Sequence, residues 1–116
     1  MHELSIAEEM VEILVGHLAD YSGSSVESVV VAVGDYSGVD PESLRLVFPF
    51  AAEGTPVEGS ELIINTIRVS VKCLDCGERT DKISTPLCST CGSRNLEFDS
   101  GRELEITSFD ISTDKK

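Results

Sequence analysis

The segment from Cys73 to Gly92 reads CLDCGERTDKISTPLCSTCG and holds all four cysteines of the chain, as two C-x-x-C pairs. Because two residues separate the cysteines of each pair, one tight turn directs both sulfurs toward the same point. Two facing turns then supply the four thiolates of a tetrahedral metal site. A glycine follows each pair, which indicates a backbone angle that a Cβ disfavours. Four thiolates leave no open coordination position, so we expect a structural Zn(II) ion held by Cys73, Cys76, Cys88 and Cys91.

Three other roles for these cysteines compete with zinc. Two disulfides require an oxidising compartment, and the first twenty residues, interrupted by four glutamates, do not read as a signal peptide. A redox C-x-x-C is usually a single pair beside a βαβ pattern. A rubredoxin-like iron site uses the same geometry, so an iron-containing electron carrier stays open as an alternative function.

Composition limits the class of protein. A chain of 116 residues with 41% hydrophobic residues supports one domain, or a small domain with a metal-held appendage. No apolar run reaches the length of a membrane span, so we expect a cytoplasmic protein with no membrane partner. The two histidines lie far apart and no serine or cysteine has the surroundings of a nucleophile, so we expect no enzyme activity.

The charge argues against the second alternative function, a zinc-ribbon adaptor that binds nucleic acid. The chain has 9 Lys and Arg against 21 Asp and Glu, a net charge of −12. Binding to phosphates requires a basic surface. Residues 73–101 are themselves acidic, with three basic against five acidic side chains before the thiolates are counted. We therefore expect no nucleic-acid partner.

The amino terminus reads Met1-His2-Glu3. A free terminal amine, the amide nitrogen of His2 and its imidazole can reach one metal ion, and Glu3 can supply a fourth donor through its amide or carboxylate. A flat, nitrogen-rich donor set suits Ni(II) or Cu(II). Taken alone, however, a histidine at position two is most often simply solvated.

The segments before the cysteines predict two helices and a strand. Apolar residues at spacings of three and four predict a helix over residues 5–21, capped by Ser5 or starting earlier at Glu3, with His17 in a packing role. The apolar run of residues 26–34 predicts a central strand covered on both faces. Asp40 reads as the N-cap of a second helix, which we expect to kink or break at Pro49.

The segments on either side of the cysteines predict two long strands, residues 61–72 and 101–112. Each changes the parity of its apolar residues once, near Asn65 or Thr66 and at Thr107 to Ser108, which indicates a bulge or a twist. We expect these strands to form an antiparallel pair with the zinc unit inserted at its tip. The predicted fold is α+β: a small sheet of about three strands, two helices, and a zinc-ribbon-like four-cysteine segment between the last two long strands.

Several motifs together resemble the HypA family of nickel metallochaperones, which help to mature [NiFe]-hydrogenases and, in some organisms, urease. They are MHELS at the amino terminus, the SGVDPE loop at 37–42, the EGT and EG connector at 53–59, and the paired C-x-x-C. The resemblance implies that Ni(II) is bound as cargo by Met1, His2 and Glu3, with Zn(II) on the four cysteines. Some members add an acidic ligand at the position matching Asp40.

The resemblance also implies partners and a division of the chain. The partners are a HypB-type GTPase, the large subunit of a hydrogenase and, where urease is the client, urease accessory machinery. Residues 1–72 plus 101–116 would form a nickel-binding α/β domain, and residues 73–100 the zinc-binding segment. The oligomeric state stays open between a monomer, a homodimer and a strand-swapped form.

Overall fold

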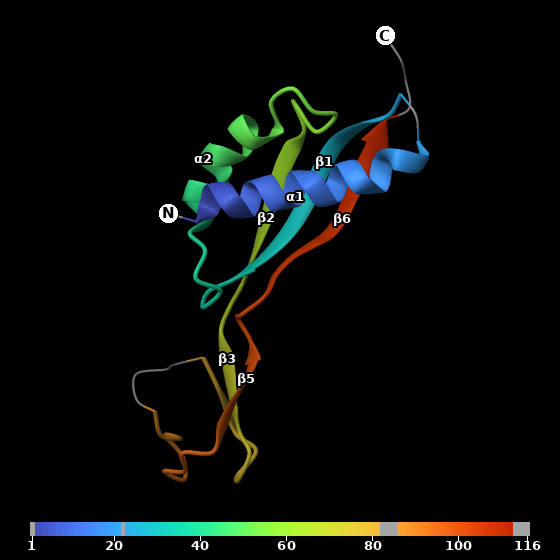
Figure 1. Cartoon of the computed structure of the whole chain (residues 1–116). Coiled ribbons are helices and arrows are strands. Elements are labelled where there is room, and N and C mark those ends of the chain that lie inside the picture. The colour runs from blue at the N-terminus through green and yellow to red at the C-terminus, as the bar shows by residue number, and fades with distance from the viewer. Residues whose placement is uncertain (1, 22, 82–85, 113–116) are drawn as a thin grey trace.

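The computed structural model describes residues 2–21, 23–81 and 86–112, and it has two helices and two small sheets. The first sheet has the order β2-β1-β6 and the second the order β4-β3-β5. The chain is elongated, 61 × 26 × 17 Å, with the second sheet projecting from the first (Figure 1). The α+β prediction is confirmed. In chain order the elements are α1 Glu3–His17, the 3-10 turn η1 Leu18–Asp20, β1 Ser25–Gly34, α2 Pro41–Ala52, β2 Glu61–Ile67, β3 Ser70–Cys73, β4 Arg79–Thr80, β5 Leu96–Ser100 and β6 Leu104–Ser112.

Strand β1 is the centre of the first sheet, as predicted, with β2 parallel on one side and β6 antiparallel on the other. Its alternate residues Val29, Val31 and Val33 are buried in one core with residues of both helices. The prediction that both faces of β1 are covered is confirmed only in part. On the opposite face Ala32 is buried, but Val30 is half-buried and its β2 neighbour Ile63 is 37% exposed, because both helices pack on the same side.

Helix α1 begins at Glu3, the earlier of the two predicted starts, and His2 occupies the N-cap position. The Ile6 N–H donates to the His2 carbonyl at 3.0 Å, so Ser5 lies inside the helix and the predicted Ser5 cap is wrong. His17 ends the helix, with its ring 5.5 Å from that of Phe109 on β6. Within the described residues, neither helix is long and apolar enough to cross a membrane.

Helix α2 confirms the predicted cap and overturns the predicted break. The Asp40 carboxylate accepts hydrogen bonds from the Glu42 N–H at 3.3 Å and the Ser43 hydroxyl at 2.9 Å. The helix continues through Pro49 to Ala52. Proline cannot donate to the carbonyl four residues earlier. That carbonyl belongs to an exposed turn where water can reach it, while the buried side chains of Phe48 and Ala52 hold the helix on both sides of the proline.

The predicted long strand over residues 61–72 is divided between the two sheets. Strand β2 ends at Ile67, and β3 starts at Ser70 in the second sheet. The predicted change of parity at Asn65 or Thr66 is confirmed, because Ile64 is half-buried before these two exposed residues and Ile67 after them. The pairing of β2 with β1 stays regular there, so the change involves no bulge. The predicted antiparallel pair is also wrong for the first sheet, because β6 pairs with β1 and not with β2. In the second sheet β3 pairs antiparallel with β5, but β5 is Leu96–Ser100 and precedes the predicted strand 101–112, so the expected pair is absent there too. The predicted bulge at Thr107 is confirmed, since Val30 pairs with Ser108 and Val31 with Ile106.

The two sheets meet where Gly34 at the end of β1 lies against the backbone of Gly101. A Cβ on Gly34 would lie 2.2 Å from the carbonyl carbon and oxygen of Gly101. Beside this contact, the Tyr36 N–H donates to the Gly101 carbonyl at 2.6 Å, and the Asp35 carboxylate accepts the Val69 N–H at 3.1 Å. The loop after β1 therefore holds both chain segments that pass between the sheets.

Replacing Gly34 with alanine tests this close approach. We expect Gly34→Ala to lower the free energy of unfolding by about 1–3 kcal/mol, because the added methyl group must push two backbones apart. Urea denaturation measures the change. Gly16→Ala is the matched control, since a Cβ there meets nothing within 4 Å and α1 should gain about 0.5–1 kcal/mol from helix propensity. If both variants were equally stable, the contact between the sheets would not constrain the fold.

Candidate metal centre

The four cysteines come together at the far end of the second sheet. One ligand atom from each of Cys73, Cys76, Cys88 and Cys91 lies within 4.8 Å of all the others, and in the described part of the chain this is the one such group of three or more potential ligand residues. The Cys73 and Cys91 sulfurs are 3.6 Å apart, and those of Cys76 and Cys88 are 3.7 Å apart. The predicted convergence of the two pairs is therefore present in the fold.

Each cysteine pair sits on the same kind of turn. The Gly77 N–H donates to the Cys73 carbonyl, and the Gly92 N–H to the Cys88 carbonyl, both at 2.9 Å. The φ angles of Gly77 and Gly92 are 82° and 77°, a region that disfavours a Cβ, as the sequence predicted. The first turn follows directly from β3, which ends at Cys73.

At two of the four positions, backbone N–H groups outweigh the opposing effects and lower the pKa of the thiol. The Cys91 and Thr90 N–H groups, each 3.4 Å from the Cys88 sulfur, lower the pKa of the Cys88 thiol to about 6. The Cys76 N–H likewise lowers the pKa of Cys73. Thiolate is the form that binds metal. Cys73 and Cys88, which are buried, are therefore prepared for ligation by the turns themselves.

The other two thiols resist ionisation when no cation is present. The Glu78 N–H favours the thiolate of Cys76, but burial and the neighbouring sulfurs outweigh it and raise the pKa of Cys76 to about 12. The pKa of Cys91 is also raised: the Ser93 N–H opposes the shift, and the Cys73 sulfur and burial cause it. Four thiolates cannot share this space without a cation, so the donor set fits a divalent, thiophilic ion such as Zn(II).

The predicted amino-terminal site is only partly visible. Met1 lies outside the described residues. The His2 side chain is 60% exposed, and its Nδ1 is 3.8 Å from Oε1 of Glu3. The structure thus brings His2 and Glu3 together at the open end of α1, next to the start of α2.

Glu3 has a structural role that its sequence position did not reveal. Its carboxylate is buried and accepts the Asp40 N–H at Oε2, at 3.1 Å. This hydrogen bond is the main cause that lowers the pKa of Glu3, and it joins the first turn of α1 to the residue that caps α2. Asp40 is therefore adjacent to Glu3, but its own carboxylate oxygens already accept from Glu42 and Ser43. The apolar stripe of α1 could have indicated that Glu3 is buried, because it places Glu3 one helical turn before the buried Ala7.

Removing one sulfur tests the cysteine site. We expect Cys88→Ser to lose the bound metal and to collapse the amide NMR dispersion of β3 and β5, because the ion replaces a hydrophobic core in this segment. Resonances of β1, in the helix-covered sheet, should change little. Elemental analysis gives the metal content. Ser89→Ala, one residue along the same turn, is the control and should keep a full equivalent of metal. Retention of metal by Cys88→Ser would contradict the assignment.

The Glu3 carboxylate predicts a pH-dependent contribution to stability. Its pKa is lowered from an ordinary value of 4.5, so folding favours the charged form. The stabilisation is complete above the unfolded pKa and is lost as pH falls through the lowered folded pKa. Glu3→Gln should therefore lower the melting temperature at pH 7, and the difference from the parent should shrink below about pH 4.5. Glu8→Gln, an exposed position on the same helix, should show a smaller change than Glu3→Gln at pH 7.

Comparison with known proteins places this arrangement in a family. The family model described as "Hydrogenase/urease nickel incorporation, metallochaperone, hypA" matches residues 1–111. The hydrogenase maturation factor HypA of Aquifex aeolicus is 35% identical over 115 residues, covering 98% of this chain and 100% of the relative. The HypA of Chlorobaculum tepidum is 38% identical over 112 residues, covering 96% and 99%.

Solved structures share the fold. The solution structure of the Ni metallochaperone HypA from Helicobacter pylori matches with a TM-score of 0.69 and 24% identity, covering 96% of this chain and 97% of that one. A second HypA solution structure matches with a TM-score of 0.73 and 24% identity, covering 98% of each chain. From its near-complete match to the family model and its identity to these relatives, the chain belongs to the HypA family of hydrogenase maturation factors.

Proposed function

We propose that this chain binds Ni(II) at its amino terminus and delivers it for assembly of the [NiFe]-hydrogenase metallocentre, with urease as the second client class. The observation that carries the proposal is the position of His2, which is 60% exposed at the start of α1 in a chain that matches the nickel-incorporation family from residue 1. The proposed ligands are the Met1 amine, the imidazole and amide nitrogen of His2, and the amide nitrogen of Glu3. The Glu3 side chain assists.

The chemistry of this site suits a metal ion that is bound and then transferred to a partner. A plane of nitrogen donors selects ions that accept square-planar geometry, which distinguishes Ni(II) from Zn(II) by geometry. A ligand set at the end of a helix has no enclosing cavity, so a partner can approach the ion and replace its ligands one at a time. Protons compete for the amine and the imidazole, so nickel affinity should fall in mild acid.

The two carboxylates near His2, those of Glu3 and Asp40, differ in how readily they could help to bind nickel. Oε2 of Glu3 holds the Asp40 N–H, whereas Oε1 faces His2 at 3.8 Å. Glu3 can therefore orient the imidazole or approach the ion without releasing α2. Asp40 would have to give up hydrogen bonds that cap α2 before it could bind nickel. We therefore assign the assisting role to Glu3 and the capping role to Asp40.

The second metal is proposed to be architectural. Zn(II) held by Cys73, Cys76, Cys88 and Cys91 would have no open position for a substrate, and it would cross-link two turns that have little core of their own. We accordingly propose residues 1–72 plus 101–116 as the nickel-binding domain and residues 73–100 as the zinc-binding segment. The family match favours neither the iron electron carrier nor the nucleic-acid adaptor.

The proposed setting follows from the family's role in metallocentre assembly. A maturation factor passes metal on and need not catalyse a reaction. We propose that the nickel donor and acceptor steps involve a HypB-type GTPase and the large subunit of a hydrogenase, or urease accessory proteins, in the cytoplasm.

Substituting the proposed ligand tests the nickel site. We expect His2→Ala to reduce nickel affinity by at least about 100-fold, since the imidazole closes the chelate, while zinc content and melting temperature stay unchanged. Calorimetric titration with Ni(II) gives the affinity. His17→Ala is the matched control, because it removes the other histidine at the opposite end of α1 and should bind nickel like the parent.

Adding residues before Met1 provides an independent test of the terminal amine. A Gly-Ser extension converts the Met1 amine to an amide and should weaken nickel binding as much as His2→Ala does. Equal nickel affinities of the extended and native chains would overturn the proposed ligand set.

A further inference from the structure

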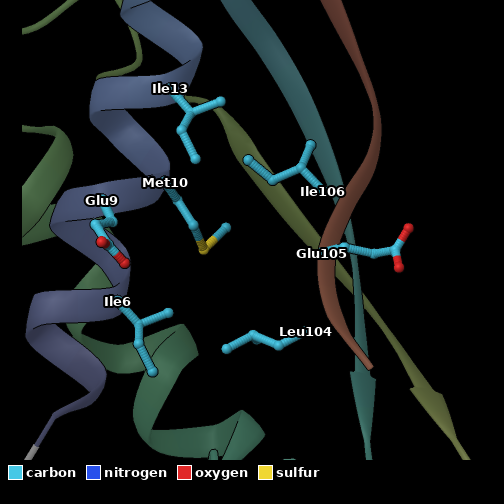
Figure 2. Close-up of a pocket in the computed structure, with 7 residues that line it drawn as sticks. All are labelled: Ile6, Glu9, Met10, Ile13, Leu104, Glu105 and Ile106. Atoms are coloured by element: carbon cyan, nitrogen blue, oxygen red, sulfur yellow. The ribbon is translucent and has the colours of Figure 1, made fainter. Parts of the chain in front are cut away.

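An apolar groove runs between α1 and the edge of the first sheet (Figure 2). Its walls are Ile6, Met10 and Ile13 of α1 and Leu104 and Ile106 of β6, whose side chains point toward one another across the gap. Its volume is about 320 Å³. Ile13 is 53% exposed and Leu104 is 39% exposed, so large apolar side chains that belong to a core layer remain open to solvent. We call this feature the α1–β6 groove.

The groove continues along the helix. A smaller hollow of about 140 Å³ shares Ile13 and Ile106 with it and extends to His17 and Phe109. The walls contributed by α1 thus run from Ile6 to His17, which corresponds to about 16 Å of helix. An extended chain of about five residues has this length.

The strand that forms one wall has a free edge. Strand β6 is the last in the order β2-β1-β6, and within the described residues it pairs with β1 alone. Backbone groups on the outer side of such a strand are available to another chain. A strand added there would continue the sheet, and every second side chain of the added strand would point into the α1–β6 groove.

The charge around the groove selects its occupant. Helix α1 and strand β6 together contain no Lys or Arg, and their acidic residues are Glu3, Glu8, Glu9, Glu12, Glu105 and Asp110. Glu9 lines the groove, and Glu105 projects from the other face of β6 (Figure 2). A second copy of this chain would bring the same acidic set against itself. A segment with Lys or Arg at alternate positions would turn these side chains to the face of the sheet away from α1, where Glu105 and Asp110 of β6 lie.

We propose that the α1–β6 groove docks an extended cationic segment of a partner protein, which adds to the free edge of β6 and inserts alternate apolar side chains between Ile13 and Ile106. The added strand satisfies the outer backbone groups of β6, and its apolar side chains cover the exposed part of the core layer. Its basic side chains lie along the acidic surface. The proposal does not involve nickel ligation, so it can fail or hold independently of the proposed function.

A pair of synthetic peptides tests the proposal on the full chain with zinc bound and nickel removed. One hexapeptide alternates Lys and Val, and the other has the same composition with three Lys followed by three Val. We expect the alternating peptide to shift amide resonances of β6 and of the groove side of α1, and to slow hydrogen exchange at outward-facing β6 amides. The block peptide should bind at least about fivefold more weakly, because only the alternating sequence places all three Val side chains on one face of the strand.

Matched variants locate the binding site. Ile13→Ser should weaken binding of the alternating peptide by about fivefold, the effect expected from losing one partly buried apolar contact. Leu46→Ser removes an apolar side chain that is 72% exposed on α2, and it should leave peptide binding unchanged. His2→Ala should also leave peptide binding unchanged, which separates this result from any failure of the nickel site.

Three results would overturn the proposal. Equal binding of the two peptides would show attraction by charge alone. Amide shifts outside α1 and β6 would place the site elsewhere. A dimer of the chain alone by sedimentation, dissociated by Ile13→Ser, would make a second copy the occupant of the groove.

Discussion

Gly34 and Gly101 meet backbone to backbone, and the two sheets are arranged around this contact. Gly34 ends the central strand of the helix-covered sheet, and Gly101 follows the strand that returns from the cysteines. The loop after Gly34 then accepts a backbone N–H through Asp35 and ends at Asp40, whose own N–H holds Glu3. One short loop therefore anchors both the cysteine-bearing ribbon and the first turn of the helix that carries His2. The close approach is possible only because Gly34 has no Cβ, which would meet the Gly101 backbone, and because Gly101 has none to meet Val69.

The two ends of the molecule differ in how they can treat a metal ion. At the cysteine end, repeated turns aim four sulfurs at one point and backbone N–H groups favour the thiolate at Cys73 and Cys88. Such a donor set encloses an ion and uses its binding energy to hold the segment folded. At the amino-terminal end, the His2 imidazole is exposed and its neighbour Glu3 is fixed by α2. If the proposed nickel site is here, its open position would let an ion enter and leave, as a metal carrier requires.

The net negative charge of the chain affects which partners it can bind. With a net charge of −12, the surface attracts cations and repels polyanions, which agrees with a role in metal transfer and argues against nucleic-acid binding. Only some of the acidic residues lie at the proposed docking site. Glu9 lines an apolar groove beside a free strand edge, and Glu105 lies on the other face of that strand, where charge and backbone hydrogen bonding favour the same kind of cationic, extended segment. In the proposed docking, surface charge therefore acts at short range, on a defined site, as well as through its overall field.

The sequence alone determined the features that depend on local spacing. The two C-x-x-C pairs with their glycines, the Asp40 cap, the central apolar strand and the bulge at Thr107 all follow from neighbours within a few residues. A nickel-binding role of His2 and Glu3 could be predicted only from the donor atoms that they offer and from the family resemblance. Tertiary structure decided the rest: which strand pairs with β6, where the chain passes from one sheet to the other, and that α2 continues through its proline. It also decided that Glu3 binds the backbone of Asp40, because residues 37 positions apart meet only after both helices pack on the same face of the sheet.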